Sequence, residues 1–139
     1  MRLFLDANIA FSAALSDGAV RRLLYDLVDK GHTLVMDSYV WEEAGRNLLV
    51  YRAAAIENLH RLSLHIEIVG TVKSRLPKET VLEEFPEKDL PVISSAVEHK
   101  CSILITGDKL HFGRYYGKRI AGVTILSPTE AAERFIRDG

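Results

Sequence analysis

Residues 102–109 of the chain read SILITGDK. The first four of these residues are typical of a buried strand, and a Thr-Gly-Asp turn follows them directly. The turn places the carboxylate of Asp108 at the carboxyl end of an apolar strand. In open α/β sheets this edge is where ligands bind. The stretch therefore predicts both an α/β fold and a functional site that includes Asp108.

Strand and helix patterns alternate along the rest of the chain. Short apolar runs predict further strands at residues 3–5, 33–36, 65–69 and 122–126. Apolar side chains at helical spacing predict a short helix or turn at residues 9–15, and helices at 20–28, 39–64, 91–97 and from 128 onward. The long helix at 39–64 can divide at Tyr51-Arg52, and residues 109–120 are predicted to form a loop. This order predicts a three-layer α/β/α sandwich with a mostly parallel central sheet, whose strand order stays open.

The composition is that of one ordinary globular domain spanning residues 1–139. Of its residues 47% are hydrophobic and 27% are charged, and the net charge is −1. This balance excludes a globally basic nucleic-acid binder, so anion binding would need a local patch or a metal. Cys101 is the only cysteine, which excludes an intrachain disulfide and suits a reducing cytoplasm. No apolar run approaches the ~20 residues of a membrane span, so we expect no membrane association.

Further carboxylates are predicted at the same edge as Asp108. Asp6 ends the first predicted strand, and Asp89 precedes the helix that leads into residues 102–105. Glu42 and Glu43 lie in the first turns of the helix that follows the second strand. Gathered carboxylates repel one another, and such a cluster is tolerated mainly when a cation occupies it. Oxygen ligands of this kind suit Mg²⁺ or Mn²⁺.

Each acid also has a purely structural interpretation. Asp89 can be a helix N-cap, and Asp108 can be an ordinary turn residue. One of Glu42 and Glu43 can be a solvated residue that suits the helix dipole. Asp6 is harder to explain in this way, because an acid at the end of a buried strand needs partners. The joint pattern is therefore stronger evidence than any single position.

The segment after Asp108 combines basic and aromatic side chains. Basic groups neutralise phosphates, and aromatic rings stack on unpaired bases. An RNA-binding segment beside the acids is one interpretation, and a solvated surface loop with its aromatic rings in the core is the other. The basic side chains are Lys109, His111, Arg114, Lys118 and Arg119, and the aromatic ones are Phe112, Tyr115 and Tyr116.

Four short segments together resemble the PIN domain family, in the same order along the chain. They are LDAN at 5–8, WEEA at 41–44, KDLPVISSA at 88–96 and ILITGD at 103–108. The resemblance covers essentially the whole chain, and the last two segments are its most specific part. Residues 70–88 match nothing in the family that we can place. The loop after Asp108 lacks a further acid, which leaves a second metal position open.

The resemblance implies a metal-dependent ribonuclease, and many small members are toxins of VapBC-type toxin–antitoxin modules. It implies that four acids hold Mg²⁺ or Mn²⁺ and carry the catalysis, namely Asp6, Glu43, Asp89 and Asp108. Glu43 is preferred over Glu42 because the family's glutamate is usually the second of such a pair. Asn8 and Thr106 match supporting polar positions, and Lys109, His111 and Arg114 are the expected RNA contacts. The implied partners are RNA, an antitoxin protein and a second copy of the chain.

Three other functions remain open from the sequence. A haloacid-dehalogenase-like phosphatase would use Asp6 as its nucleophile, but it needs an acid two residues later, where this chain has Asn8. A receiver-type signalling domain would need two adjacent acids near the start of the chain. A non-catalytic PIN-like scaffold that binds RNA or protein is the third alternative, and the presence of all four matching acids counts against it.

Overall fold

The first strand, β1 (Arg2–Leu5), lies at the centre of a six-stranded sheet. The side chains of Leu3, Phe4 and Leu5 are fully buried. A strand that is apolar on both faces needs a covering layer on each, which is the arrangement of a parallel sheet inside an α/β protein. The computed structural model describes residues 1–71 and 90–137, and the statements below concern those residues.

The strand order is β3-β2-β1-β4-β6-β5. All neighbours pair in parallel except β5 and β6, which are antiparallel. The order reverses direction at β1, because β2 and β3 lie on one side of it and β4 and β6 on the other. The remaining strands are β2 (Thr33–Asp37), β3 (Ile66–Val69), β4 (Ile103–Ile105), β5 (Arg119–Ile120) and β6 (Val123–Leu126).

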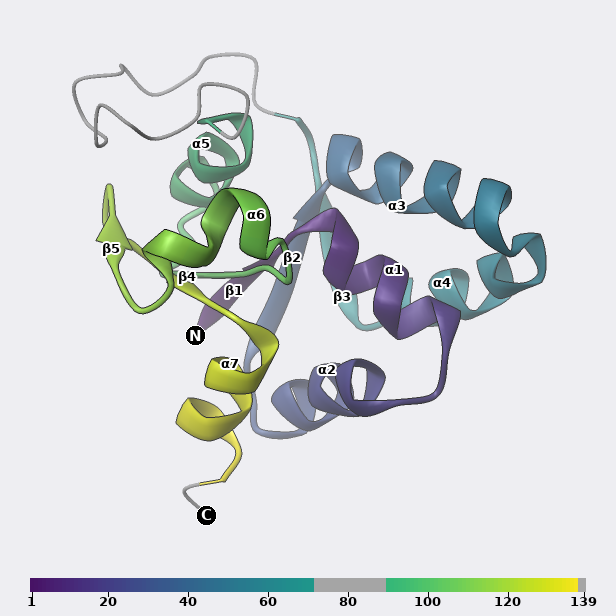
Figure 1. Cartoon of the computed structure of the whole chain (residues 1–139), viewed down its shortest axis with the longest axis horizontal. Coiled ribbons are helices and arrows are strands. Elements are labelled where there is room, and N and C mark those ends of the chain that lie inside the picture. Colours follow the sequence, from purple (N-terminus) through teal and green to yellow (C-terminus); the bar gives the residue numbers. More distant parts are fainter. Residues whose placement is uncertain (72–89, 138–139) are drawn as a thin grey trace.

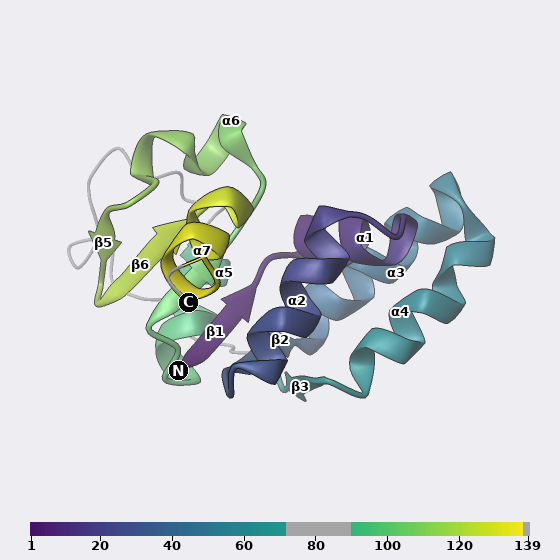
Figure 2. The same ribbon diagram turned by 90° about the horizontal axis from the view of Figure 1, so that it is seen from below.

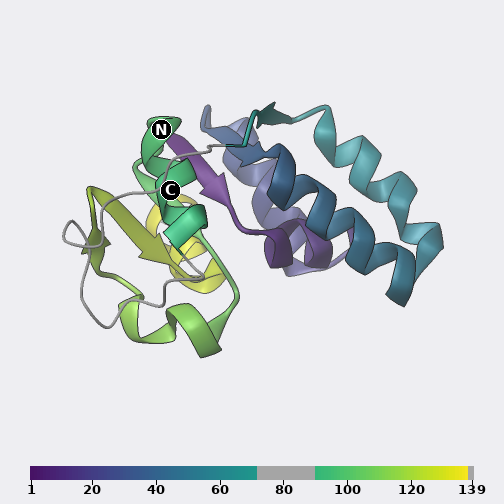
Figure 3. The ribbon, with the colours of Figure 1, turned by 90° about the horizontal axis from the view of Figure 1, so that it is seen from above.

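Helices cover both faces of this sheet (Figure 1). In Figure 2, seen from below, α2 and α7 lie in front of the strands, whereas in Figure 3, seen from above, α5 does. The helix α1 packs against α2, α3 and α4. The predicted three-layer α/β/α sandwich is therefore confirmed. The helices are α1 (Ala7–Leu15), α2 (Ala19–Asp29), α3 (Ser38–Tyr51), α4 (Ile56–Ser63), α5 (Leu90–Glu98), α6 (Lys109–Phe112) and α7 (Pro128–Phe135).

The predicted elements agree closely with the observed ones over residues 1–69. The predicted break of the long helix is real: α3 ends at Tyr51, and Arg52 leaves the helical conformation with φ −158° and ψ 91°. The strand expected over residues 65–69 is β3, at the edge of the sheet. At the other end of the chain, Ser127 and Glu130 form the predicted capping box of α7. Residues 72–89, including Asp89 and most of the uninterpreted segment 70–88, lie outside the described residues.

The prediction of a loop over residues 109–120 is wrong. The segment contains α6, a turn of 3-10 helix at Gly113–Tyr115, and β5. Buried side chains of Phe112 and Tyr115 fix it to the core, which a loop pattern in the sequence does not reveal. Ala121 and Gly122 then form a two-residue connection to β6, both at positive φ (51° and 86°), as tight hairpins require.

In the described part of the chain, no helix is long and apolar enough to cross a membrane. The longest helix there is α3, which carries Glu42 and Glu43. Its first residues are held by Asp37, whose buried carboxylate accepts a hydrogen bond from the amide of Val40 at 2.8 Å. This N-cap fixes the start of α3 at the carboxyl end of β2, the edge where ligands bind in sheets of this kind.

Candidate functional site

The register of β1 and β4 brings Asp6 and Thr106 together. Leu5 is paired with Ile105, so the next residue of each strand reaches the same point of the sheet edge. The amide of Asp6 donates to the carbonyl of Ile105 at 3.1 Å, which extends the pairing by one step. The hydroxyl of Thr106 then donates to Oδ2 of Asp6 at 2.9 Å. Because the strand order reverses at β1, this point is also the topological switch point of the sheet.

Asn8 ties the turn after β4 to the turn after β1. Its Oδ1 accepts a hydrogen bond from the amide of Gly107 at 2.7 Å. Its Nδ2 lies 3.2 Å from Oδ2 of Asp6 and 3.4 Å from the hydroxyl of Thr106. A Cβ on residue 107 would lie 3.2 Å from Oδ1 of Asn8, so glycine suits this close approach. The supporting positions Asn8 and Thr106 therefore belong to one network around Asp6.

The carboxylate of Asp6 is buried and faces other acids. Burial raises its pKa above the usual range, while hydrogen bonds from Thr106 and from the amide of Ala7 lower it. The charges of Glu43 and Asp108 then raise the same pKa further. The balance leaves the pKa raised, which means that holding Asp6 ionised costs free energy. A cation beside these three acids would offset that cost.

Asp108 lies at the same edge but in a different environment. Its amide donates to the hydroxyl of Thr106 at 3.1 Å, and its carboxylate caps α6. Oδ1 accepts from the amide of His111 at 3.1 Å, and Oδ2 lies 2.6 Å from Nδ1 of the same residue. Burial raises the pKa of Asp108, but these hydrogen bonds and the charge of His111 outweigh burial and leave the pKa lowered.

The two adjacent glutamates of α3 differ in exposure. Glu42 is exposed, whereas Glu43 is half-buried and its charge acts on Asp6. This difference favours Glu43 as the member of the pair that belongs to the acidic site. Asp89 falls among the residues whose placement is not described. Within residues 1–71 and 90–137, no group of three or more His, Cys, Asp or Glu side chains is close enough to hold a metal ion.

The donor set fits a hard divalent cation. Asp6 and Asp108 offer carboxylate oxygens at one sheet edge. The charge of Glu43, on α3, raises the pKa of Asp6. Oxygen donors of this kind are those that Mg²⁺ and Mn²⁺ take in proteins, and such ions keep several waters when few carboxylates bind them. The chemistry of these oxygen donors therefore fits such an ion, with water and substrate completing its coordination.

Tyr116 is a residue of the site that sequence reasoning did not single out. Its hydroxyl donates to the carbonyl of Thr106 at 2.8 Å. Burial raises the pKa of the Tyr116 phenol, and the charges of Asp108, Glu130 and Asp6 raise it further. The phenol therefore holds the backbone just after β4, and it lies close enough to Asp108 and Asp6 to interact with their charges. In the sequence its only signal was its place among the aromatic residues after Asp108.

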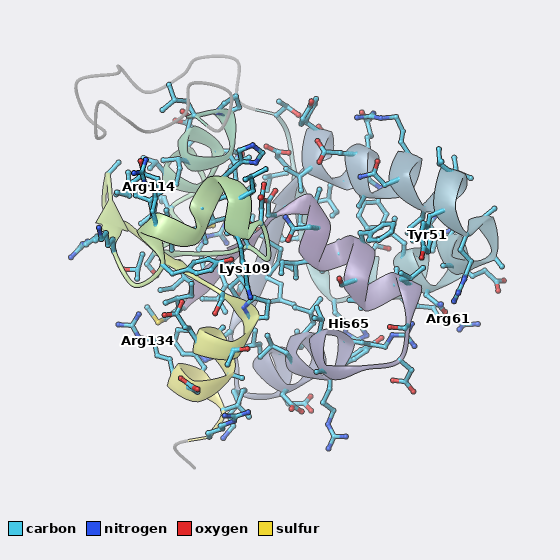
Figure 4. The ribbon with its side chains drawn as sticks, viewed as in Figure 1. Tyr51, Arg61, His65, Lys109, Arg114 and Arg134 are labelled. Atoms are coloured by element: carbon cyan, nitrogen blue, oxygen red, sulfur yellow. The ribbon has the colours of Figure 1, made fainter. Side chains whose placement is uncertain are left out.

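The predicted RNA contacts lie on α6 and on the turn of 3-10 helix that follows it. Figure 4 shows Lys109 beside α6 on the side that faces α1, whereas Arg114 lies toward β5. Both side chains are exposed, and His111 is half-buried against Asp108. Lys109 thus lies next to the acids in sequence and in space. Arg114 is held one turn further along by the buried rings of Phe112 and Tyr115.

Comparisons with known proteins agree with this architecture. A chain of VapBC2 from Rickettsia felis, solved bound to a DNA fragment from the promoter, is 18% identical with a TM-score of 0.62. The alignment covers 91% of this chain and 98% of that one. A chain of VapBC-1 from nontypeable Haemophilus influenzae is 16% identical with a TM-score of 0.56, over 93% and 99% of the two chains. At such identities the likeness shows the fold alone.

The sequence itself matches a family model over most of its length. No curated protein matches the chain. The family model described as PIN domain matches residues 2–110, a range that runs from β1 to just beyond Asp108. The matched range includes Asp6, Glu43 and Asp108, and its end coincides with the start of α6. The chain therefore belongs to the PIN domain family.

Proposed function

We propose that the chain is a metal-dependent endoribonuclease that hydrolyses phosphodiester bonds of RNA. The observation that carries the proposal is the hydrogen-bonded network that joins Asp6, Asn8, Thr106 and Asp108 at the switch point of the sheet. Membership of the PIN domain family supports the same chemistry. The proposed ligands of Mg²⁺ or Mn²⁺ are Asp6, Asp108, Glu43 and Asp89.

The surroundings of each proposed residue suit it to a different part of the reaction. A divalent cation at this edge would lower the pKa of a bound water and neutralise charge on the phosphate. Thr106 and the amide of Ala7 hold the two oxygens of Asp6 in place. Glu43 or Asp89 takes up the proton of the attacking water. Burial of Asp6 excludes bulk water, which strengthens each of these electrostatic interactions.

RNA would reach the acids over the exposed surface of α6 and β5. The chain carries a net charge of −1, so contacts with phosphates have to be local. Lys109, His111 and Arg114 are the proposed contacts, with Lys109 adjacent to Asp108. Basic side chains placed on one side of an acidic site orient the RNA backbone so that one phosphate faces the metal.

The geometry favours a nuclease over a phosphatase of the haloacid-dehalogenase kind. Such a phosphatase would need a second acid where Asn8 stands. The amide oxygen of Asn8 instead accepts from Gly107, and its nitrogen lies beside Asp6. Asn8 therefore serves to join two turns rather than to transfer a proton.

We expect Mn²⁺ alone to bind the full chain and stabilise it. A ligand that binds only the folded state at 100 times its Kd adds about 2.7 kcal/mol to the free energy of unfolding. Calorimetric titration gives the affinity, and thermal unfolding with and without Mn²⁺ gives the stabilisation. Chelation by EDTA should abolish RNA cleavage, and restoring Mg²⁺ or Mn²⁺ should recover it.

Two outcomes of this titration would favour the rival functions. A chain that binds no Mg²⁺ or Mn²⁺ at millimolar metal, yet retains RNA, would be a non-catalytic scaffold. A chain that releases phosphate from a small phosphomonoester but leaves RNA intact would be a phosphatase. Neither result could come from a metal-dependent ribonuclease.

We further propose that the chain is the toxin of a toxin–antitoxin pair and acts as a homodimer in the cytoplasm. Its fold is similar to chains of two VapBC complexes, which supports an antitoxin partner. Leu49, Val50 and Tyr51 expose large apolar surfaces at the end of α3, where a second copy could pack. Sedimentation of the full chain should give twice the monomer mass, and a monomer would contradict the dimer. An antitoxin-like reading frame directly beside this one is expected.

A further inference from the structure

One residue, His111, contacts both carboxylate oxygens of Asp108. Its backbone amide donates to Oδ1 at 3.1 Å, and its ring Nδ1 lies 2.6 Å from Oδ2. An ionised carboxylate can only accept hydrogen bonds, so Nδ1 carries the hydrogen in this pair. The side chains of His111 and Asp108 are 27% and 29% exposed, so the contact is partly shielded from water.

The partner acid is held in a different way. Asp6 receives its hydrogen bonds from an amide, a hydroxyl and a carboxamide at the sheet edge: Ala7, Thr106 and Asn8. Ala7 and Asn8 begin α1 directly after β1, and Thr106 directly follows β4, so the buried sheet fixes all three donors in place. No histidine is among them. The backbone of Asp108 shares Thr106 with Asp6, but the two carboxylates are held by different donors, and only the carboxylate of Asp108 depends on α6.

The support of Asp108 begins in the core. Phe112 is buried and anchors α6, a single helical turn. His111 immediately precedes Phe112, so the anchored turn sets where the imidazole lies. The imidazole in turn holds one oxygen of Asp108 while the backbone of the same turn holds the other. A carboxylate held at both oxygens has one orientation rather than several.

We propose that His111 is a positioning residue whose Nδ1–H holds the carboxylate of Asp108 in a single orientation and thereby supports binding of the divalent cation at the proposed site. The inference rests on the proposed function, because it concerns the same metal site. It needs only the hydrogen on Nδ1, which both the neutral Nδ1–H tautomer and the imidazolium carry. Contact with RNA through Nε2 is compatible with this role.

The test compares replacements that keep or lose a donor at the Nδ1 position. Asparagine at residue 111 can place its amide nitrogen near the position of Nδ1, whereas glutamine reaches toward Nε2 and leucine offers no donor. We expect His111→Leu and His111→Gln to bind Mn²⁺ about 10–100-fold more weakly, the usual effect of removing a hydrogen-bond partner of a metal ligand. His111→Asn should bind Mn²⁺ nearly as well as the unmodified chain.

Mn²⁺ alone, added to the full chain without RNA, is the probe, and electron paramagnetic resonance of the unbound ion reads the affinity. Leu110→Ala is the matched control, because Leu110 lies in the same turn, is 87% exposed and contributes only its backbone to Asp108. Thermal unfolding followed by circular dichroism verifies that each variant is folded. Should the leucine variant fail to fold, the comparison of asparagine with glutamine decides.

Three results would overturn the inference, and they can be told apart. Unchanged Mn²⁺ affinity in His111→Leu would leave the proposed metal site standing and remove the role of His111. Nearly unchanged Mn²⁺ affinity in His111→Gln but not in His111→Asn would show that a donor at the Nε2 position, and not at Nδ1, supports metal binding. Equal Mn²⁺ affinity in Asp108→Asn and the unmodified chain would refute the proposed function at this site, and the inference would fall with it.

Discussion

Replacing Asp6 with asparagine is expected to abolish RNA cleavage, with a loss on the order of a thousandfold. A metal ion contributes several kcal/mol to stabilising charge in the transition state, and each 1.4 kcal/mol corresponds to a factor of ten in rate. Asparagine keeps the size of the side chain but removes the charge that holds the ion. Cleavage of a single-stranded RNA at saturating Mg²⁺ or Mn²⁺ measures the effect.

The same substitution should change how stability depends on pH in the metal-free protein. Burial, and then the charges of Glu43 and Asp108, raise the pKa of Asp6 in the folded chain above the usual value of an aspartate. A raised pKa means that the folded state favours the protonated acid. Its contribution is therefore fully present below the unfolded pKa and is lost as the pH rises through the folded pKa. Asparagine has no such proton to lose.

We therefore expect the free energy of unfolding of Asp6→Asn to rise relative to that of the unmodified chain as the pH rises from about 4 to neutral. Urea unfolding at several pH values in EDTA measures this difference. Asp29→Asn, at the exposed end of α2, removes the same charge far from the site and is the control. A difference independent of pH, together with full cleavage activity, would contradict both the electrostatic description of Asp6 and its proposed role.

Replacing Thr106 with valine is expected to weaken metal binding and cleavage by about 10–100-fold, although Thr106 is not itself a proposed ligand. Its hydroxyl donates to Asp6 and accepts from the amide of Asp108, and its side chain is fully buried. Valine has nearly the same shape but can do neither. The unpaired groups left behind should also lower the free energy of unfolding by about 1–3 kcal/mol.

Thr106→Ser separates the hydroxyl from the methyl group. Serine retains the donor and acceptor, so we expect its Mn²⁺ affinity to lie close to that of the unmodified chain, with a small loss of stability from the missing methyl. Calorimetric titration and urea unfolding of both variants provide the two measurements. Wild-type metal affinity in Thr106→Val would show that Asp6 and Asp108 are oriented without the hydroxyl.

Much of the fold could be predicted from the sequence because its central strands are short apolar runs that end in polar turns. Asp6 and Asp108 stand out for this reason: Asp6 directly follows three buried residues, and only Gly107 separates Asp108 from four. The choice of Glu43 over Glu42 came from family resemblance, and the exposure of the two side chains favours the same choice. The roles of the acids as ligands stay predictions.

What the sequence could not reveal depends on contacts between distant residues or on very short elements. The hydrogen bond from Gly107 to Asn8 joins positions 99 residues apart, and no local pattern encodes it. The order of the strands likewise depends on pairing between residues that are far apart in the sequence. By contrast, the contact between Asp108 and His111 is local, and an Asp at a cap position followed three residues later by a possible donor could have indicated it. The turn α6 could not be predicted, because one turn of helix has no periodicity to detect.

The pairing of β1 with β4 has a consequence for how the protein is made. Asp6 and Asn8 are synthesised well before Thr106, which holds Asp6 and is 100 positions further along the chain. Because synthesis proceeds from the amino end, an unfinished polypeptide carries two members of the network and none of their partners from β4. A stalled or proteolytically cleaved copy that ends before β4 would therefore lack Asp108 and could not form the proposed metal site. Synthesis through residue 108 is thus required before the proposed metal site can form.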